Sequence, residues 1–360
     1  MVWKRWVTCI VLAILALLIK IFSFFPDSVE KYYAQGFYPF ISRILRVLLG
    51  WIPISAGDLF YAGVLIWIIF SFISFLRKLF AGRIKAPYAS WLGLRILSSL
   101  LLLYIVFNLL WGLNYERKGI ADQMQLEIRP YSTEELFQLL QLVVDHLNAN
   151  DSAAHEGRMA LKKKSNLFHE AIEAYQNRKK IDQFLQYKSP SVKPSMFSLL
   201  GNYFGFTGYY NPFSGEAQVN TTVPLFIQPF TTCHEIGHQL GYAKENEANF
   251  SGYLSAMASE NPAFRYSASF ELYSYAALEL YFRDSTLLRP LREKLNPGIK
   301  EDFAALRAYL KKYENPFEPY IRGLYGRYLK ANGQPQGLRT YDEVTAWIIA
   351  YYKKYGREAS

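Results

Sequence analysis

The chain has 360 residues, of which 51% are hydrophobic and 17% aromatic, and its formal charge is +10. This length exceeds one compact soluble core of typical size, and the apolar share is high for a soluble chain, which excludes a single soluble domain. A basic balance is typical of nucleic-acid binders, but much of the excess lies in loops beside apolar runs, so we expect no nucleic-acid partner.

The apolar excess lies almost wholly in residues 1–113, which we expect to form a membrane domain. Three apolar runs, at about 6–25, 59–76 and 92–113, have the length of about 20 residues that crosses a hydrocarbon core of roughly 30 Å. A cleaved signal peptide is the competing interpretation of the first run. Its end, FSFFPDS, lacks a small-residue cleavage site, so we favour an uncleaved anchor and expect the lipid bilayer as a partner.

A fourth apolar run, at about 37–56, carries Arg43 and Arg46 in its middle and is interrupted by two prolines. Each arginine near the bilayer centre would cost at least about 2.5 kcal/mol on insertion scales. We therefore expect an interfacial amphipathic helix rather than a fourth span.

The cationic residues predict the orientation of the chain. They lie before the first span and in the loop between the second and third, at Lys4, Arg5, Arg77, Lys78, Arg83 and Lys85. Short loops rich in lysine and arginine stay in the cytoplasm. With three spans, residues 114–360 are then expected to be extracytoplasmic, and a fourth span would reverse that orientation.

Residues 114–360 carry mainly helical patterns. Ser132 begins a capping box with Glu135, and a charged helical pattern follows at about 158–187. Two strand candidates, FGFTGYY and EAQVNTTV, flank the turn residues NPFSG, which predicts a small hairpin or sheet. Helical patterns return after residue 229 and continue at about 266–284, 298–313, 316–331 and 341–355. The predicted fold is therefore mainly α, with a small β element.

The stretch TTCHEIGHQLGYAKENEANF, at residues 231–250, carries the most specific chemistry. His234 and His238 are four positions apart, so on a helix their rings project from one face about 6 Å apart. Two imidazole nitrogens at that spacing can share a zinc ion, and the adjacent Glu235 can act as a general base on water. HEIGH thus fits the HExxH arrangement of zinc hydrolases.

A catalytic zinc needs a third protein ligand, and a helix that reverses after Gly241 would supply one. Glu245 and Glu247 both lie in its first turns. Residues that are two positions apart on a helix point about 200° from each other, so only one of these two glutamates can coordinate the metal well.

HEIGH followed by ENEAN resembles the gluzincin metallopeptidases, in particular membrane-bound zinc peptidases with an ExxAD sequence on the following helix. The resemblance implies that Glu245 binds zinc and that Asn249 occupies the position that supports a histidine ligand. Glu247 is the alternative ligand. Asparagine in place of aspartate departs from the pattern, because its carbonyl can accept a hydrogen bond but adds no charge.

Nearly the whole chain is similar to a bacterial membrane-protein family of unknown function. The membrane spans and the stretches GYYNPFSGEAQVN and HEIGHQLGYAKENEANF carry this similarity. It implies the same layout in a bacterial inner (plasma) membrane and leaves the substrate open.

The strand before the zinc helix resembles the edge strand on which metallopeptidases align peptide substrates. This role is expected of Glu216, Ala217, Gln218, Val219 and Asn220, and a mere surface hairpin is the alternative. Donors to a developing oxyanion are also expected beside the zinc. The tyrosine candidates are Tyr209, Tyr210 and Tyr341.

These features together predict a membrane domain at 1–113 and a zincin-like, gluzincin-like metallohydrolase domain at 114–360. The expected function is zinc-dependent hydrolysis of a peptide or envelope-protein substrate outside the cytoplasm, with Glu235 as general base. The alternative is a non-catalytic zinc-containing membrane scaffold or peptide-binding protein of the cell envelope.

Overall fold

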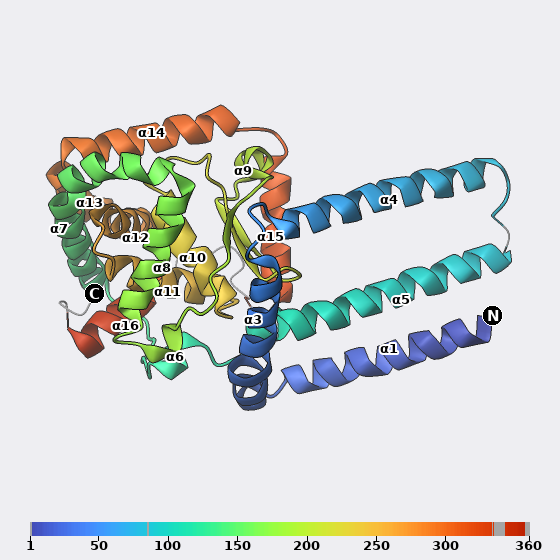
Figure 1. Ribbon diagram of the computed structural model, residues 1–360. Coiled ribbons are helices and arrows are strands. Elements are labelled where there is room, and N and C mark those ends of the chain that lie inside the picture. The colour runs from blue at the N-terminus through green and yellow to red at the C-terminus, as the bar shows by residue number, and fades with distance from the viewer. Residues whose placement is uncertain (1, 85, 333, 335–342, 357–360) are drawn as a thin grey trace.

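The computed structural model describes residues 2–84, 86–332, 334 and 343–356. Within them the chain is mainly α-helical and contains one small three-stranded sheet, which confirms the predicted fold class. Figure 1 shows three long helices that extend side by side from a larger helical domain.

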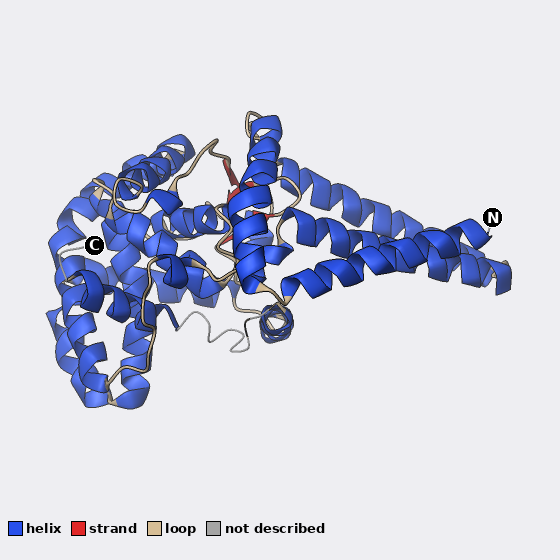
Figure 2. Ribbon diagram, turned by 90° about the horizontal axis from the view of Figure 1, so that it is seen from below, coloured by secondary structure: helices blue, strands red, loops and turns tan. Residues whose placement is uncertain are grey.

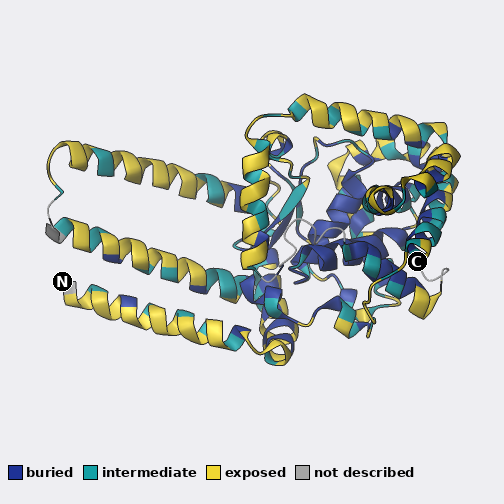
Figure 3. Ribbon diagram, turned by 180° about the vertical axis from the view of Figure 1, so that it is seen from behind, coloured by how far each residue is buried: buried dark blue, intermediate teal, exposed yellow. Residues whose placement is uncertain are grey.

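The three long helices are α1 (Val2–Ser23), α4 (Ala56–Phe80) and α5 (Ala86–Leu110). Of the described helices, these three are long and apolar enough to cross a membrane, and at most 11% of each apolar stretch is buried. Their exposed surface is evident in Figure 3. Apolar surface of this extent is unfavourable in water, so the helices indicate association with a membrane.

The segment between the first two long helices contains no further long helix. It comprises α2 (Pro26–Ser28), the π-helical η1 (Val29–Phe37) and α3 (Tyr38–Leu49), which lies across the ends of the long helices in Figure 1. The 12 residues of α3 extend about 18 Å, which is too short to cross a hydrocarbon core of about 30 Å. One face of α3 is exposed and apolar, and Arg46 on the opposite face is buried against the helical domain.

The helical domain follows α5 through a short 3-10 segment, η2 (Gly112–Glu116). Its helices are α6 (Ile120–Gln123), α7 (Thr133–Gly157), α8 (Lys164–Arg178), α9 (Ser198–Phe204), α10 (Gln228–Gln239), α11 (Glu245–Met257), α12 (Pro262–Arg283), α13 (Ser285–Lys294), α14 (Pro297–Tyr313), α15 (Glu318–Ala331) and α16 (Glu343–Tyr355). Two further 3-10 segments are η3 (Arg158–Lys162) and η4 (Gln183–Leu185).

One contiguous apolar core holds this domain together. It is formed mainly by α7, α8, α10, α11, α12 and α16, with α12 packed along α7 and α10 along α11. The predicted capping box starts α7: the Glu135 amide donates to Ser132 Oγ at 3.1 Å, and the Ser132 amide donates to the Glu135 carboxylate at 2.7 Å. The charged pattern predicted as one helix at 158–187 is interrupted, because only Lys164–Arg178 is α-helical.

The sheet lies between the long helices and the core of the helical domain (Figure 2). Its strands are β1 (Val192–Pro194), β2 (Gly208–Asn211) and β3 (Glu216–Val219), in the order β1-β3-β2. The antiparallel pair β2–β3 is the predicted hairpin, and β1 adds a parallel strand on the other side of β3. The strand β3 is therefore central and fully buried.

Candidate metal centre

The two histidines of the HEIGH stretch lie on α10, which is buried along its whole length. The helix begins at Gln228 and ends before Gly241. Gly241 has a positive φ of 91°, and a methyl group there would lie 2.8 Å from the Tyr38 ring. Glycine fits both constraints, and the reversal it permits leads the chain directly into α11.

Close packing of α10 on α11 brings the candidate ligands together. A methyl group at Gly252 would lie 3.0 Å from the backbone nitrogen of His234, and one at Gly237 would lie 2.3 Å from Ser251 Oγ. Each helix thus presents a glycine where the other crosses it. The short separation of the two backbones places the first turn of α11 beside the histidine rings.

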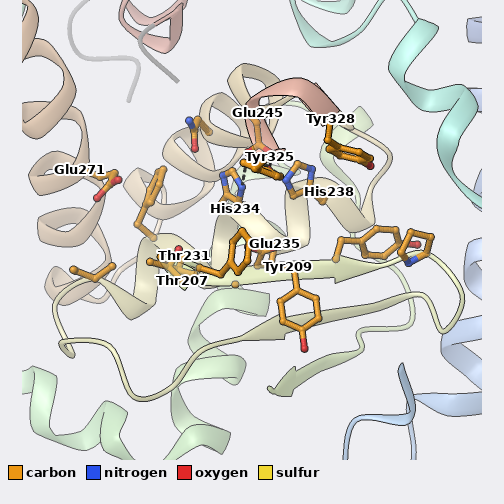
Figure 4. Close-up of a pocket in the computed structure, with 18 of the residues that line it drawn as sticks. Thr207, Tyr209, Thr231, His234, Glu235, His238, Glu245, Glu271, Tyr325 and Tyr328 are labelled. Atoms are coloured by element: carbon orange, nitrogen blue, oxygen red, sulfur yellow. Dashed lines mark hydrogen bonds and ion pairs between the residues drawn. The ribbon is translucent and has the colours of Figure 1, made fainter. Parts of the chain in front are cut away.

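Four side chains converge at this crossing (Figure 4). One potential ligand atom from each of His234, Glu235 and His238 lies within 4.8 Å of the others. Glu245 Oε2 is 3.4 Å from His234 Nε2 and 3.7 Å from His238 Nε2. Ligands about 2.0–2.2 Å from a tetrahedral zinc are roughly 3.4 Å apart, so the separations of Glu245 Oε2 from the two imidazole nitrogens are close to those in a zinc site.

Hydrogen bonds orient one of the two histidines. His238 Nδ1 is 2.8 Å from the carbonyl oxygen of Tyr242, which requires a ring proton on Nδ1 and directs Nε2 toward Glu245. His234 Nδ1 is buried and has no hydrogen-bond partner among the described residues, and neither has Asn249 Nδ2. The hydrogen bond that the Asn249 carbonyl was expected to accept from a histidine is therefore absent here, although Asn249 lines the same cavity.

Glu247 is directed away from the histidines. A methyl group at Gly119 would lie 1.8 Å from Glu247 Oε1, so its carboxylate occupies a space beside residue 119. Burial raises the pKa of Glu247, and the nearby Arg117 opposes that shift. The structure thus places Glu245, and not Glu247, beside the two imidazoles.

Burial and mutual charge determine protonation in the centre. Burial raises the pKa of Glu235 to about 7, although the neighbouring histidines oppose the shift. Burial also disfavours the charged form of His238, but the Glu245 carboxylate outweighs it and raises the pKa of His238. The pKa of Glu245 is well below its usual range despite burial, because both histidines stabilise its anion. A carboxylate anion, two imidazoles and a carboxyl group that titrates near neutrality thus share one site.

A cavity of about 500 Å³ opens onto this centre. Residues of β2, α10, α12, α14 and α15 line it, together with aromatic side chains at the ends of α4 and α5. On the β2 side, a methyl group at Gly208 would lie 2.5 Å from Glu235 Oε1. The absence of a side chain at residue 208 gives the general-base candidate its place beside the strand.

The expected oxyanion donors do not face the centre. Tyr209 donates a hydrogen bond to Asp58 and shares another with Ser195 Oγ at 2.9 Å, and Figure 4 shows its hydroxyl pointing away from the histidines. The Tyr210 hydroxyl accepts from Tyr38 at 3.3 Å. Tyr341 lies outside the described residues.

Two tyrosines on α15 were not predicted from the sequence. Tyr325 donates a hydrogen bond of 2.6 Å to Glu245 Oε1. Tyr328 stacks on it, with ring centroids 6.1 Å apart, and its hydroxyl lies 3.1 Å from that of Tyr115. The helix α15 is 80 residues beyond Glu245 in the chain, so no local spacing in the sequence relates them.

The structure corrects the predicted substrate strand. Residues Glu216, Ala217, Gln218, Val219 and Asn220 do not form an edge, because β3 is paired on both sides. The Glu216 carboxylate accepts hydrogen bonds from the Gly57 amide at 2.7 Å and the Ala56 amide at 3.2 Å. It thereby satisfies free amides at the amino terminus of α4, where a negative charge is favourable.

The edge strand beside the centre is β2 instead. It pairs only with β3 within the described sheet, and Gly208, Tyr209 and Tyr210 line the cavity. Asn220 is also structural, since its side-chain amide donates to Ser198 O at 3.1 Å and Phe206 O at 3.0 Å.

Comparison with known proteins gives a family but no characterised relative. No curated protein and no solved structure matches the chain. The model of one family, described as a protein of unknown function (DUF3810), matches residues 33–349. The match begins within η1, after α1, and covers α4, α5, the sheet and the histidine centre, and the chain therefore belongs to the DUF3810 family of proteins of unknown function.

Proposed function

We propose that the chain is a membrane-anchored zinc-dependent metallopeptidase. The observation that carries this proposal is the convergence of Glu245 on His234 and His238, with donor atoms 3.4 and 3.7 Å apart and Glu235 beside them. Two imidazoles and one carboxylate form a donor set used by catalytic zinc, with one position left for water or substrate. This arrangement supports the gluzincin-like interpretation of HEIGH and ENEAN.

Zinc bound by these three residues would supply Lewis-acid activation of water and of a carbonyl group. Glu235 would accept the proton of the attacking water at its carboxylate and donate it to the leaving amine. In the metal-free protein burial raises the pKa of Glu235 to about 7, and a group that titrates near the working pH can serve as base and then as acid. Tyr325 would hold the Glu245 carboxylate through its 2.6 Å hydrogen bond.

The strand β2 provides a place for an extended peptide. Its outer edge is unpaired within the described sheet, and its first residue, Gly208, lies directly beside Glu235. A peptide added to this edge would have its backbone fixed by main-chain hydrogen bonds. The scissile bond would then lie near Glu235 and the histidines, so β2 replaces β3 as the proposed substrate strand.

The proposal is tested with full-length protein in detergent, assayed on a broad peptide library. We expect hydrolysis by the wild type, loss of hydrolysis on chelation, and a loss of at least about 10³-fold in Glu235→Gln. Glu260→Gln, the same chemical change at an exposed turn, is the matched control and should retain activity. If wild type and Glu235→Gln bind zinc equally and neither cleaves a peptide, the non-catalytic scaffold is the better account.

The location of the centre is a separate part of the proposal. The cationic residues in the first turns of α1 and around the connection from α4 to α5 would stay in the cytoplasm, which would put the helical domain on the extracytoplasmic side of a bacterial inner membrane. A reporter fused after Ser360 tests this orientation. Activity of a periplasmic reporter supports it, and activity of a cytoplasmic reporter contradicts it.

A further inference from the structure

A second cavity, of about 740 Å³, lies between α3 and the helical domain. It is bordered by Gln239, Leu240 and Tyr242, which follow the second histidine of the centre in the chain. No described aspartate or glutamate lines this cavity. Four cationic side chains do, namely Arg43, Arg46, Arg117 and Lys188. The charged side chains that line the cavity are therefore all cationic.

Arg46 in this cavity has a buried and incompletely hydrogen-bonded guanidinium group. The residue is only 6% exposed, and its Nε and Nη1 atoms are buried without a hydrogen-bond partner among the described residues. The Arg46 guanidinium carbon lies 5.7 Å from the centroid of the Tyr187 ring. A buried charge without hydrogen bonds is energetically unfavourable, so a hydrogen-bond acceptor bound in this cavity would stabilise Arg46.

Arg117 in the same cavity shows the contrast. It donates to the two carboxylate oxygens of Glu30 at 2.7 and 3.0 Å and to the Gly241 carbonyl at 3.2 Å. Its charge is thus compensated within the protein. The charge of Arg46 is not, although both arginines border the same space.

Two further cations and a hydroxyl surround Arg46. Arg43 and Lys188 are exposed and line the same cavity from opposite sides, on α3 and on the loop after η4. Ser42, one turn before Arg46, is 1% exposed; its Oγ lies near Tyr38 but makes no hydrogen bond of normal geometry. Several donors thus line one cavity in which Arg46 Nε and Nη1 have no hydrogen-bond partner among the described residues.

The position of the cavity identifies the source of the anion. The helix α3 lies across the ends of the three membrane helices (Figure 1), at the level where lipid headgroups lie. Its outer face and the residues beyond it expose apolar side chains: Phe40 at 65%, Val47 at 58%, Leu48 at 60% and Trp51 at 78%. An amphipathic helix of this kind inserts its apolar face at the membrane boundary, and the cavity lies directly beneath it.

We propose that this cavity binds the phosphate group of an anionic phospholipid. Arg46 would donate two parallel hydrogen bonds to the phosphate oxygens, a geometry that suits a guanidinium group better than an ammonium group. Arg43 and Lys188 would add charge attraction at the exposed side of the cavity, and the lipid tails would lie along the apolar face of α3. A soluble phosphate has the same chemistry, but the apolar face of α3 favours the lipid.

The test uses full-length protein in a neutral detergent, with short-chain phosphatidylglycerol, short-chain phosphatidylcholine or inorganic phosphate at equal ionic strength. Native mass spectrometry measures lipid retention, and thermal unfolding measures stabilisation. We expect phosphatidylglycerol to be retained and to raise Tm, phosphatidylcholine to do neither, and inorganic phosphate to have a much smaller effect. Arg46→Gln should weaken retention of phosphatidylglycerol about tenfold or more.

Matched variants keep the test decisive. If Arg46→Gln does not fold, the double variant Arg43→Gln/Lys188→Gln changes only exposed side chains and should also weaken retention. Arg77→Gln, at the far end of α4, is the control and should leave retention unchanged. Equal binding of both lipids, or unchanged retention in the cavity variants, overturns the proposal. Stabilisation by inorganic phosphate equal to that by phosphatidylglycerol would assign the cavity to a soluble phosphate instead.

Discussion

Replacement of Gly208 by alanine should reduce peptidase activity without removing the metal. The added methyl would lie 2.5 Å from Glu235 Oε1, 2.8 Å from Glu235 Cγ and 2.9 Å from the Gln218 carbonyl oxygen, whereas ordinary contact begins at 3.4 Å. The difference of 3.4 − 2.5 = 0.9 Å must be relieved by movement of Glu235 or of the strand. Because the neighbouring backbone is fixed by the sheet, we expect the carboxylate to move.

A displacement of about 1 Å in a catalytic group can reduce the rate about 10²-fold, and overpacking costs about 1–3 kcal/mol of stability. The assay compares kcat/KM on a cleaved peptide, zinc content and Tm for wild type and Gly208→Ala. Gly157→Ala is the control, since a methyl at residue 157 meets no atom within 4 Å. Unchanged activity in a folded Gly208→Ala protein would refute the placement of Glu235 against β2. Loss of zinc from this variant would show that the substitution at residue 208 acts through the metal ligands instead of through Glu235.

Three further predictions concern the same centre. Glu245→Ala should lower zinc affinity by at least about 10²-fold, as measured by competition with a chelator, whereas Glu247→Ala should change it far less; the reverse order would exchange the ligand assignment. Tyr325→Phe should lower zinc affinity or activity about tenfold by removing the hydrogen bond to Glu245, and an unchanged variant would leave Tyr325 with no role at the centre. In the metal-free protein the pKa of Glu235 is raised from 4.5 to about 7, so the folded state binds more protons than the unfolded state in that range. Stability should therefore fall as pH rises from about 5 to 8, by up to about 3 kcal/mol more in wild type than in Glu235→Gln; parallel denaturant-unfolding profiles for the two proteins would contradict the raised pKa.

The sequence contained enough local information to predict the elements that depend on short spacing. Apolar length predicted the three membrane-crossing candidates, and a serine with a glutamate three residues later predicted the start of α7. The i, i+4 spacing of His234 and His238 predicted rings on one face, and the structure places them 4.7 Å apart between centroids. These features follow from helix geometry alone, so a single sequence suffices to find them.

Features that depend on distant contacts were not accessible in this way. The strand β1 has only three residues, Val192–Pro194, and ends in a proline, so it carries no alternating pattern. Its pairing with β3 makes β3 the central strand. The sequence indicated only the β2–β3 hairpin, so β3 was wrongly predicted to be the edge strand. Tyr325 is one of 28 tyrosines, and only its hydrogen bond to Glu245, from a helix 80 residues further along the chain, distinguishes it from the others.

The role of Glu216 shows the same limit. In the sequence it belongs to a polar strand next to the zinc helix, which suggested contact with substrate. In the structure its carboxylate binds the amides of Ala56 and Gly57, 160 and 159 residues earlier in the chain. The requirement of a helix amino terminus for an acceptor explains the contact, but no local pattern reveals which helix is involved.

The central claim, that His234, His238 and Glu245 hold a zinc ion, is tested most directly by metal analysis with zinc X-ray absorption spectroscopy on the full-length protein. We predict about one zinc per chain, bound by two imidazole nitrogens and by oxygen at about 2.0–2.2 Å, with no sulfur ligand. Glu245→Ala should lose an oxygen ligand or most of the metal. Absence of zinc from protein purified without chelator and supplied with the metal, or a sulfur-ligated ion, would contradict the account.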